Sequence, residues 1–211
     1  MAIEKSLDSI LNTNSKVKII RLFASRRDDF VATGREIARL VGVTPPATHA
    51  ALKELYSQDI LRRDIIGKQH LYRFNVKSRV VKNILTPAFK GELSIKKDIV
   101  EFLKKSILRE KLKNKIVSLI LYGSLQTGKT DKKSDVDIVI ITNTQSDKQQ
   151  TEKMFTEDIS NKFHEYFGAH LDVYIKTKDE FIKRLKKNLS PISTLMRSYS
   201  VLYGKDPIDF K

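Results

Sequence analysis

The first third of the chain has apolar positions at helical spacing, followed by two short runs rich in β-branched and aromatic residues. Apolar residues at this spacing are typical of amphipathic helices, and paired runs around a glycine are typical of a hairpin. The expected helices are residues 15–25, 36–41 and 44–57, and the expected hairpin has arms at 61–66 and 70–75. This part is therefore predicted to fold as helix, turn, helix and hairpin.

The remainder of the chain alternates helical and extended patterns. A helix is expected at residues 95–112, and a longer one, whose aromatic inner face includes Tyr166, at 145–167. The expected strands are residues 116–122, 135–142 and 170–175, and residues 202–207 are expected to form a terminal turn. This pattern predicts an α/β region with a small mixed sheet.

Several helix boundaries are marked by capping residues. Thr33 and Glu36 have the spacing of a capping box, in which the threonine and glutamate side chains each bond to a backbone amide of the other. Thr177 and Glu180 have the same spacing, and Thr44 is expected to cap the helix that follows it. These residues predict where three helices begin.

Residues 121–141 satisfy two phosphate-binding patterns at once. The segment GSLQTGKT, from Gly123 to Thr130, fits the P-loop expression, in which backbone amides and a lysine hold nucleotide phosphates. A P-loop continues into a long helix that returns to a parallel strand, yet only four residues separate Thr130 from the next strand. We therefore interpret the match as a coincidence and place Lys129 and Thr130 in a connecting turn that begins near Gly128.

The second pattern places two carboxylates on a strand. Asp135 and Asp137 are two residues apart, so both side chains are expected on one face while Val136 packs behind them. Paired carboxylates repel each other unless a cation lies between them, and their oxygen ligands suit magnesium. Gly123 would let the backbone approach a phosphate, and Ser124 would add a hydroxyl beside exposed amides.

These residues resemble the nucleotidyltransferases of the polymerase beta superfamily, and within it the minimal single-domain group. The shared features are a strand, Gly-Ser, about ten residues, Asp-x-Asp, and a third carboxylate on a later strand, here Asp172; the resemblance covers residues 95 to 205. Gln126 and Thr127 stand where the family usually has a small residue and an arginine. This departure leaves the carboxylates intact and changes the expected contacts to the triphosphate.

The resemblance implies a catalytic site and its ligands. Asp135, Asp137 and Asp172 would be catalytic and would hold two Mg²⁺ ions, and Gly123 and Ser124 would bind a nucleoside triphosphate, with ATP favoured. An acceptor hydroxyl on a protein or nucleic acid would attack the α-phosphorus and release pyrophosphate. Such catalysis depends on positioning and charge neutralisation, so no nucleophilic side chain is required. A partner chain is also plausible from the resemblance.

The charge of the chain suggests a polyanionic partner. Forty Lys and Arg residues against 25 Asp and Glu give a net charge of +15, which favours nucleic acid. In residues 12–77 the helix-turn-helix pattern with a basic hairpin resembles a winged helix-turn-helix domain of small transcription regulators. In that family the second helix enters the major groove and the wing follows the backbone.

The resemblance to winged regulators implies a set of DNA contacts. The candidate DNA-binding residues are Thr44, His49, Lys53, Arg62, Arg63 and Lys68. The exposed face of the second helix carries few side chains that discriminate bases, so phosphate contacts from the arginines and Lys68 are expected to provide most of the affinity. The alternative is a winged domain used for protein association. Analogy with winged regulators also predicts a homodimer.

Composition adds little evidence for other classes of protein. The chain has no cysteine, which excludes disulfides, and its four histidines form no metal-ligand pattern. It has no long apolar run and its first residues lack a signal-peptide core, so we expect a cytoplasmic protein that does not enter a membrane.

The sequence thus predicts a two-domain α+β protein with an N-terminal winged helix-turn-helix and a C-terminal α/β nucleotidyltransferase domain. Their expected bounds are residues 1–77 and 94–211, joined by a linker helix and loop at 78–93 that is interrupted at Thr86-Pro87 and Gly91. Two functions stay open. The chain is either a Mg²⁺-dependent nucleotidyltransferase coupled to a DNA-binding domain, or a DNA-binding regulator whose second domain binds nucleotide or a partner protein without turnover.

Overall fold

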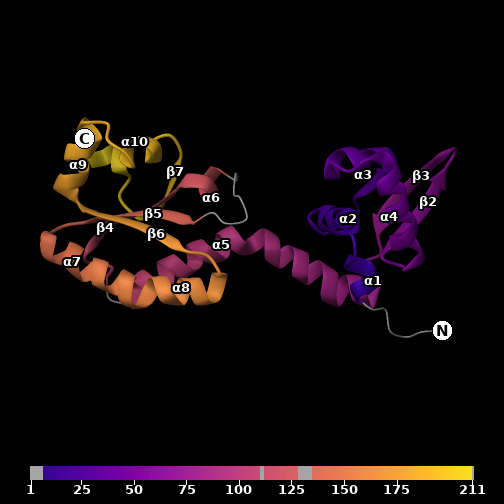
Figure 1. Cartoon of the computed structure of the whole chain (residues 1–211), viewed down its shortest axis with the longest axis horizontal. Helices are drawn as coiled ribbons and strands as arrows, with labels where there is room; N and C mark the ends of the chain where they lie inside the picture. The colour runs from indigo at the N-terminus through magenta and orange to yellow at the C-terminus, as the bar shows by residue number, and fades with distance from the viewer. Residues whose placement is uncertain (1–6, 110–111, 128–134, 211) are drawn as a thin grey trace. The chain divides into compact units, whose positions relative to one another are not determined.

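The computed structural model describes residues 7–109, 112–127 and 135–210. The chain divides into two compact units, Met1–Ile95 (unit 1) and Lys96–Lys211 (unit 2) (Figure 1). No helix in the described part of the chain is both long and apolar enough to cross a membrane.

Unit 1 combines helices with a small antiparallel sheet. Its elements are α1 (Leu7–Leu11), α2 (Asn14–Ala24), β1 (Val31–Thr33), α3 (Gly34–Val41), α4 (Pro45–Ser57), β2 (Leu61–Ile66), β3 (Gln69–Phe74) and the π-helical turn η1 (Val81–Leu85). The sheet order is β1-β3-β2, and both pairings are antiparallel. The helices and hairpin expected from the apolar spacing are therefore present, with β1 as an added strand.

The boundaries of α3 and α4 follow from local chemistry. The Thr33 side chain accepts from the Glu36 backbone amide, and the Glu36 carboxylate accepts from the Thr33 amide at 2.8 Å, which confirms the capping box. The helix α3 ends at Gly42, whose φ of 61° is one that glycine adopts without strain. Thr44 is the N-cap residue of α4, but its side chain makes no capping hydrogen bond, so this part of the expectation was wrong.

The core of unit 1 extends beyond the hairpin. Ile19, Ile20, Leu52 and Leu55 are at most 1% exposed at its centre. Further buried residues come from the segment after the hairpin, namely Val81, Leu85 and Phe89. Apolar burial by this segment contributes to the stability of unit 1.

The expected interruption at Thr86-Pro87 and Gly91 is absent. The turn η1 leads directly into α5 (Thr86–Arg109), and the Thr86 amide bonds to the Val81 carbonyl across the wider π turn. Pro87 is the second residue of α5 and has no N–H to donate to a carbonyl of the preceding turn. The helix α5 contains the boundary between the two units.

Unit 2 is built on a four-stranded mixed sheet. Its other elements are β4 (Ile116–Tyr122), α6 (Gly123–Thr127), β5 (Val136–Thr142), α7 (Gln145–Met154), η2 (Phe155–Ile159), α8 (Ser160–Phe167), β6 (Leu171–Thr177), α9 (Lys178–Lys186), α10 (Ile192–Leu195), β7 (Tyr199–Gly204) and η3 (Pro207–Phe210). The strand order is β6-β5-β4-β7, in which only the β5–β6 pairing is parallel. The expected small mixed sheet is therefore present.

Apolar residues cover both faces of this sheet. One face packs against the C-terminal part of α5 and against α7, η2 and α8, and the other packs against α9, α10 and η3 (Figure 1). Alternate residues of β5 serve the two cores: Ile138 and Ile140 face the first, and Val139 and Ile141 face the second. This explains why β5 reads as an almost continuous apolar run.

Two expectations about unit 2 were wrong. The first three residues of the segment expected as a terminal turn, 202–207, lie instead in β7 (Tyr199–Gly204), which pairs with β4, a partner far away in sequence. Tyr166 is 76% exposed instead of facing the core. The π-helical turn η2 interrupts the expected helix and changes the number of residues per turn, so a uniform helical spacing misplaces the residues that follow.

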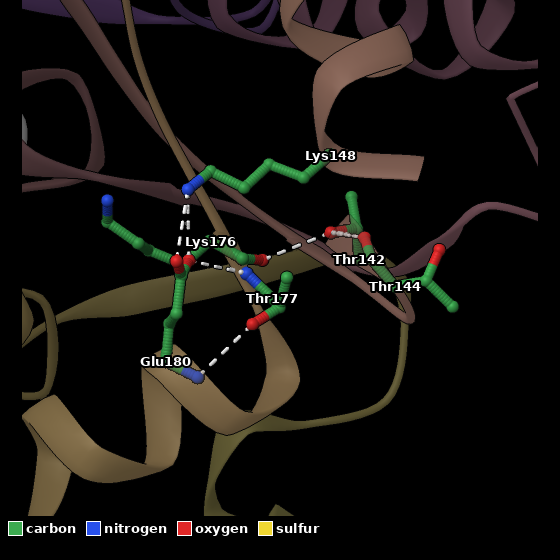
Figure 2. A network of polar contacts seen from close by, with 6 residues as sticks. All are labelled: Thr142, Thr144, Lys148, Lys176, Thr177 and Glu180. Carbon is green, nitrogen blue, oxygen red and sulfur yellow. Dashed lines mark hydrogen bonds and ion pairs between the residues drawn. The ribbon is translucent and has the colours of Figure 1, made fainter. Parts of the chain in front are cut away.

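A polar network joins α7 to the start of α9 (Figure 2). The Thr177–Glu180 capping box is present, and the ammonium of Lys148, from a lysine only 9% exposed, donates to both carboxylate oxygens of Glu180 at 3.1 Å. Although burial opposes the charged form, the Thr177 amide and Lys148 lower the pKa of Glu180 below its ordinary value. Glu180 therefore both caps α9 and neutralises a buried cation.

We expect Glu180→Gln to lower the free energy of unfolding at neutral pH by about 1–3 kcal/mol, because it leaves Lys148 without its counter-charge. A carboxylate whose folded pKa is lowered stabilises the fold above its unfolded pKa, and that stabilisation is lost as pH falls through the folded pKa. The variant should therefore lose part of the acid dependence of stability that wild type shows below about pH 5.

Denaturant unfolding at a series of pH values measures this. Asp158→Asn is the matched control, since it removes an i,i+4 ion pair between half-exposed side chains and should change stability by less than about 0.5 kcal/mol. Equal destabilisation by the two substitutions would contradict the assigned role of Glu180.

Candidate active site

Two adjacent strands, β5 and β6, bring the predicted carboxylates together at one end of the sheet of unit 2. Asp137, near the start of β5, is the direct register partner of Asp172 in the parallel neighbour β6. Asp135 is the residue immediately before β5. Asp135 and Asp172 are exposed, whereas Asp137 is half-buried. Because side chains alternate along a strand, Asp135 and Asp137 lie on the same side of the chain.

The turn after β4 packs tightly against this carboxylate pair. Gly123 has a φ of 77°, and a Cβ added there would lie 1.9 Å from Asp137 Oδ2. The adjacent Ser124 forms a backbone hydrogen bond with Asp137. The absence of a side chain at Gly123 therefore lets the β4–α6 turn close onto Asp137.

The electrostatics of the site disfavour negative charge. Burial is the main cause that raises the pKa of Asp137, followed by the charges of Asp172 and Asp135, and the bond from Ser124 offsets part of the rise. Burial, followed by the charges of Asp137 and Asp172, also raises the pKa of Tyr122 to about 12. A cation bound here would relieve the repulsion between the carboxylates.

The donor set fits a hard divalent cation, since it consists of carboxylate oxygens that repel one another. In the part of the chain that the structure describes, no three acidic or histidine side chains lie close enough to coordinate one ion together. Asp137 and Asp172 are nevertheless adjacent, and Asp135 is near enough to influence Asp137. Binding would therefore use water or phosphate oxygens as well as these carboxylates.

The structure brings together all five site residues expected in this unit: Gly123, Ser124, Asp135, Asp137 and Asp172. The antiparallel pairing of β4 with β5 differs from the parallel strands that a P-loop crossover connects. Gly128, Lys129 and Thr130, which completed the P-loop match and were expected in a turn, lie outside the described residues.

Sequence reasoning missed two side chains near the site. The Tyr122 ring is 6% exposed at the end of β4, and nothing in its sequence context distinguishes it from a core tyrosine. Lys96, from α5, donates to the Gln126 side chain at 3.0 Å and so brings a cation to α6. No local pattern links Lys96 to Gln126, because they are 30 residues apart.

In unit 1 the candidate DNA-binding residues divide between surfaces. His49 and Lys68 line one groove of about 520 Å³ between α3, α4 and the β2–β3 hairpin. Thr44 and Lys53 are exposed on or beside α4. Of the predicted contacts, the structure therefore brings His49 and Lys68 to one groove.

The two predicted arginines are already engaged. Arg62 donates to Asn75 Oδ1 at 3.0 Å, and the Arg63 guanidinium lies 4.6 Å from the centre of the Tyr56 ring. Adjacent residues of a strand point to opposite faces, so the Arg62 and Arg63 side chains lie on different faces of the hairpin.

Comparison with known proteins agrees with the geometry of unit 2. Residues 103–195 match the family model of the nucleotidyltransferase domain. The chain is also similar, at 15% sequence identity and a TM-score of 0.30, to a crystal structure of a toxin-antitoxin with AMP-PNP. The alignment covers 50% of this chain and 76% of the chain in that structure. No curated protein matches the chain.

The match to the nucleotidyltransferase domain begins within α5 and ends at α10. It includes the turn at Gly123 and Ser124 and all three aspartates, so the carboxylate site lies inside the matched region. Unit 1 lies outside the matched residues.

We expect Gly123→Ala to lower the free energy of unfolding by about 1–3 kcal/mol, because its methyl group would overlap Asp137 and its backbone would be strained. Gly91→Ala is the matched control, since that glycine lies in α5 with no atom near its added Cβ. Replacing a helical glycine by alanine should instead stabilise the protein by about 0.5–1 kcal/mol. Denaturant unfolding compares the two, and equal effects would show that Gly123 is not sterically required.

Proposed function

We propose that unit 2 is a Mg²⁺-dependent nucleotidyltransferase that transfers a nucleoside monophosphate from a triphosphate, ATP being the favoured substrate, to a hydroxyl of a protein or nucleic acid. The observation that carries this proposal is the placement of Asp172 beside Asp137, with Asp135 nearby, inside the region that matches the nucleotidyltransferase domain. Neighbouring carboxylates at the ends of adjacent strands repel each other unless a cation balances their charge.

Each residue of the site has a separate role in the proposed reaction. Asp135, Asp137 and Asp172 would hold the Mg²⁺ ions, and Asp172 would contribute to the ion that polarises the acceptor hydroxyl. Bound Mg²⁺ supplies charge neutralisation for the phosphates and the attacking oxygen. Gly123 keeps the turn close to Asp137, and Ser124 offers its hydroxyl to a phosphate oxygen. The acceptor oxygen bonds to the α-phosphorus as the bond to the departing pyrophosphate breaks.

A second candidate for unit 2 is nucleotide binding without turnover. It is supported by the absence, among the described residues, of three ligands placed around one ion, and by Gln126 and Thr127 in place of the residues usual in the family. A site that only binds nucleotide would retain affinity for the triphosphate and release no pyrophosphate. The two candidates are therefore separated by measuring turnover and binding on the same variants.

We expect Asp137→Asn and Asp172→Asn each to reduce transfer of label from an α-labelled nucleoside triphosphate by about 100-fold or more. Each substitution replaces a carboxylate by a neutral amide and so removes a negative charge that would balance the bound Mg²⁺. Asp179→Asn is the control, since Asp179 is exposed in the first turn of α9 and should leave transfer unchanged. Equal transfer by all three variants would exclude the proposed site, while nucleotide binding without transfer in wild type would support the second candidate.

For unit 1 we propose a winged helix-turn-helix that binds DNA. The order α2-β1-α3-α4-β2-β3 supports this, with α4 as the recognition helix and the β2–β3 hairpin as the wing. The exposed residues Lys53 on α4 and Lys68 at the tip of the hairpin supply positive charge on these two elements. This unit would locate the nucleotidyltransferase on DNA or control transcription, and the alternative is a unit for protein association or homodimerisation.

We expect Lys68→Gln and Lys53→Gln each to weaken DNA binding and to reduce the slope of log affinity against log salt by about one. Each substitution removes one contact with a backbone phosphate. Lys183→Gln is the matched control, because Lys183 is an exposed residue of α9 in unit 2. Fluorescence anisotropy with a mixed-sequence DNA duplex measures the change, and unaltered binding by both unit 1 variants would favour protein association.

A further inference from the structure

One groove of unit 1 collects four basic side chains from four places in the fold. Arg35 comes from α3, His49 from α4, His70 from β3 and Lys68 from the turn between β2 and β3. All four residues are exposed, so their side chains are accessible to a ligand. Arg35 and His70 were not among the residues expected from sequence to contact DNA.

Among the residues that the structure describes, no carboxylate lines this groove. Its other lining residues are uncharged: Thr33, Gly34, Pro45, Leu52, Gln69 and Tyr72. A cluster of basic groups without a counter-charge favours an anionic ligand.

Three carboxylates of the surrounding elements bond outside the set of lining side chains or at its border. Glu36 of α3 bonds to Thr33 within the capping box, and Glu54 of α4 pairs with the buried Lys16. Asp64 of β2 pairs with Arg73 at 3.3 Å, and both belong to the face of the hairpin opposite His70. The strands β1 and β3 contain no Asp or Glu. Glu36 therefore places one carboxylate at the Thr33 end of the groove, where the four basic side chains of the lining outnumber it.

Two of the four basic side chains of the groove are imidazoles. Arg35 and Lys68 are permanent cations at physiological pH, whereas imidazole is the side chain whose charge ordinarily changes between about pH 5 and about pH 8. A phosphodiester remains an anion over this range, and an anion near an imidazole favours its protonated form. A phosphate in the groove would therefore be bound more tightly when both histidines carry a proton.

We propose that this groove binds backbone phosphate of duplex DNA between Arg35, Lys68, His49 and His70, and that DNA association takes up protons at the two histidines. The inference rests on the proposed DNA-binding function of unit 1 and adds its regulation: DNA affinity increases as the pH falls. It also assigns His70 and Arg35 as phosphate contacts.

The test measures affinity of the full chain for a mixed-sequence DNA duplex by fluorescence anisotropy, from about pH 8 to about pH 5.5. We expect the affinity of wild type to be at least about tenfold higher at the lower pH. Binding that takes up protons is favoured when the proton concentration is higher. The double variant His49→Gln and His70→Gln should lose most of this dependence while still binding at pH 8. Arg35→Gln should weaken binding at every pH.

His164→Gln is the matched control. This exposed histidine lies in α8 of unit 2, whereas the residues that line the groove belong to unit 1. It should retain the wild-type pH dependence. Circular dichroism of each variant across the pH range separates loss of binding from loss of folding. Calorimetry in buffers of different ionisation enthalpy counts the protons taken up.

The outcomes separate this inference from the function on which it rests. Binding that does not change with pH, or a pH dependence that persists in the double variant, would overturn the proton-linked groove and leave DNA binding intact. Failure of folded wild type to bind duplex DNA at any pH would overturn both.

Discussion

The contact between Asp137 and Gly123 is the constraint on which the active end of unit 2 depends. The carboxylate occupies the space that a side chain at position 123 would need, so the turn after β4 can close onto β5. The same contact places the Ser124 amide against Asp137 and leaves that carboxylate half-buried beside Asp172. Burial and like charge then raise the pKa of Asp137, and this stored repulsion makes the site receptive to a cation.

The rest of unit 2 holds this end of the sheet in place. Cores on both faces bury β4 and β5 and leave the carboxylates at the strand ends. At the other ends of β5 and β6, Thr142 and Thr177 take part in hydrogen bonds that connect these strands to α7 and α9 (Figure 2). The Lys148–Glu180 pair neutralises the charge buried there. The two ends of one parallel strand pair thus have different roles: one supports the fold, and the other concentrates negative charge.

Unit 1 has the opposite electrostatic character at its candidate surface. Among the described residues that line the groove beside α4, four are basic and none is acidic, and Glu36 borders it at Thr33. The two proposed phosphate sites differ in their means: basic side chains in unit 1 and a cation held by carboxylates in unit 2.

The sequence by itself determined features that depend on neighbouring residues. Capping boxes at Thr33 and Thr177, the hairpin around Gly67, and the shared side of Asp135 and Asp137 follow from short-range bonding and side-chain periodicity. Only the tertiary structure decided the strand β7, the exposure of Tyr166 and the groove that joins His49 to His70. It also placed Asp172 directly opposite Asp137. These features depend on strand register and on contacts between distant segments, which a local pattern of apolar and polar residues does not encode.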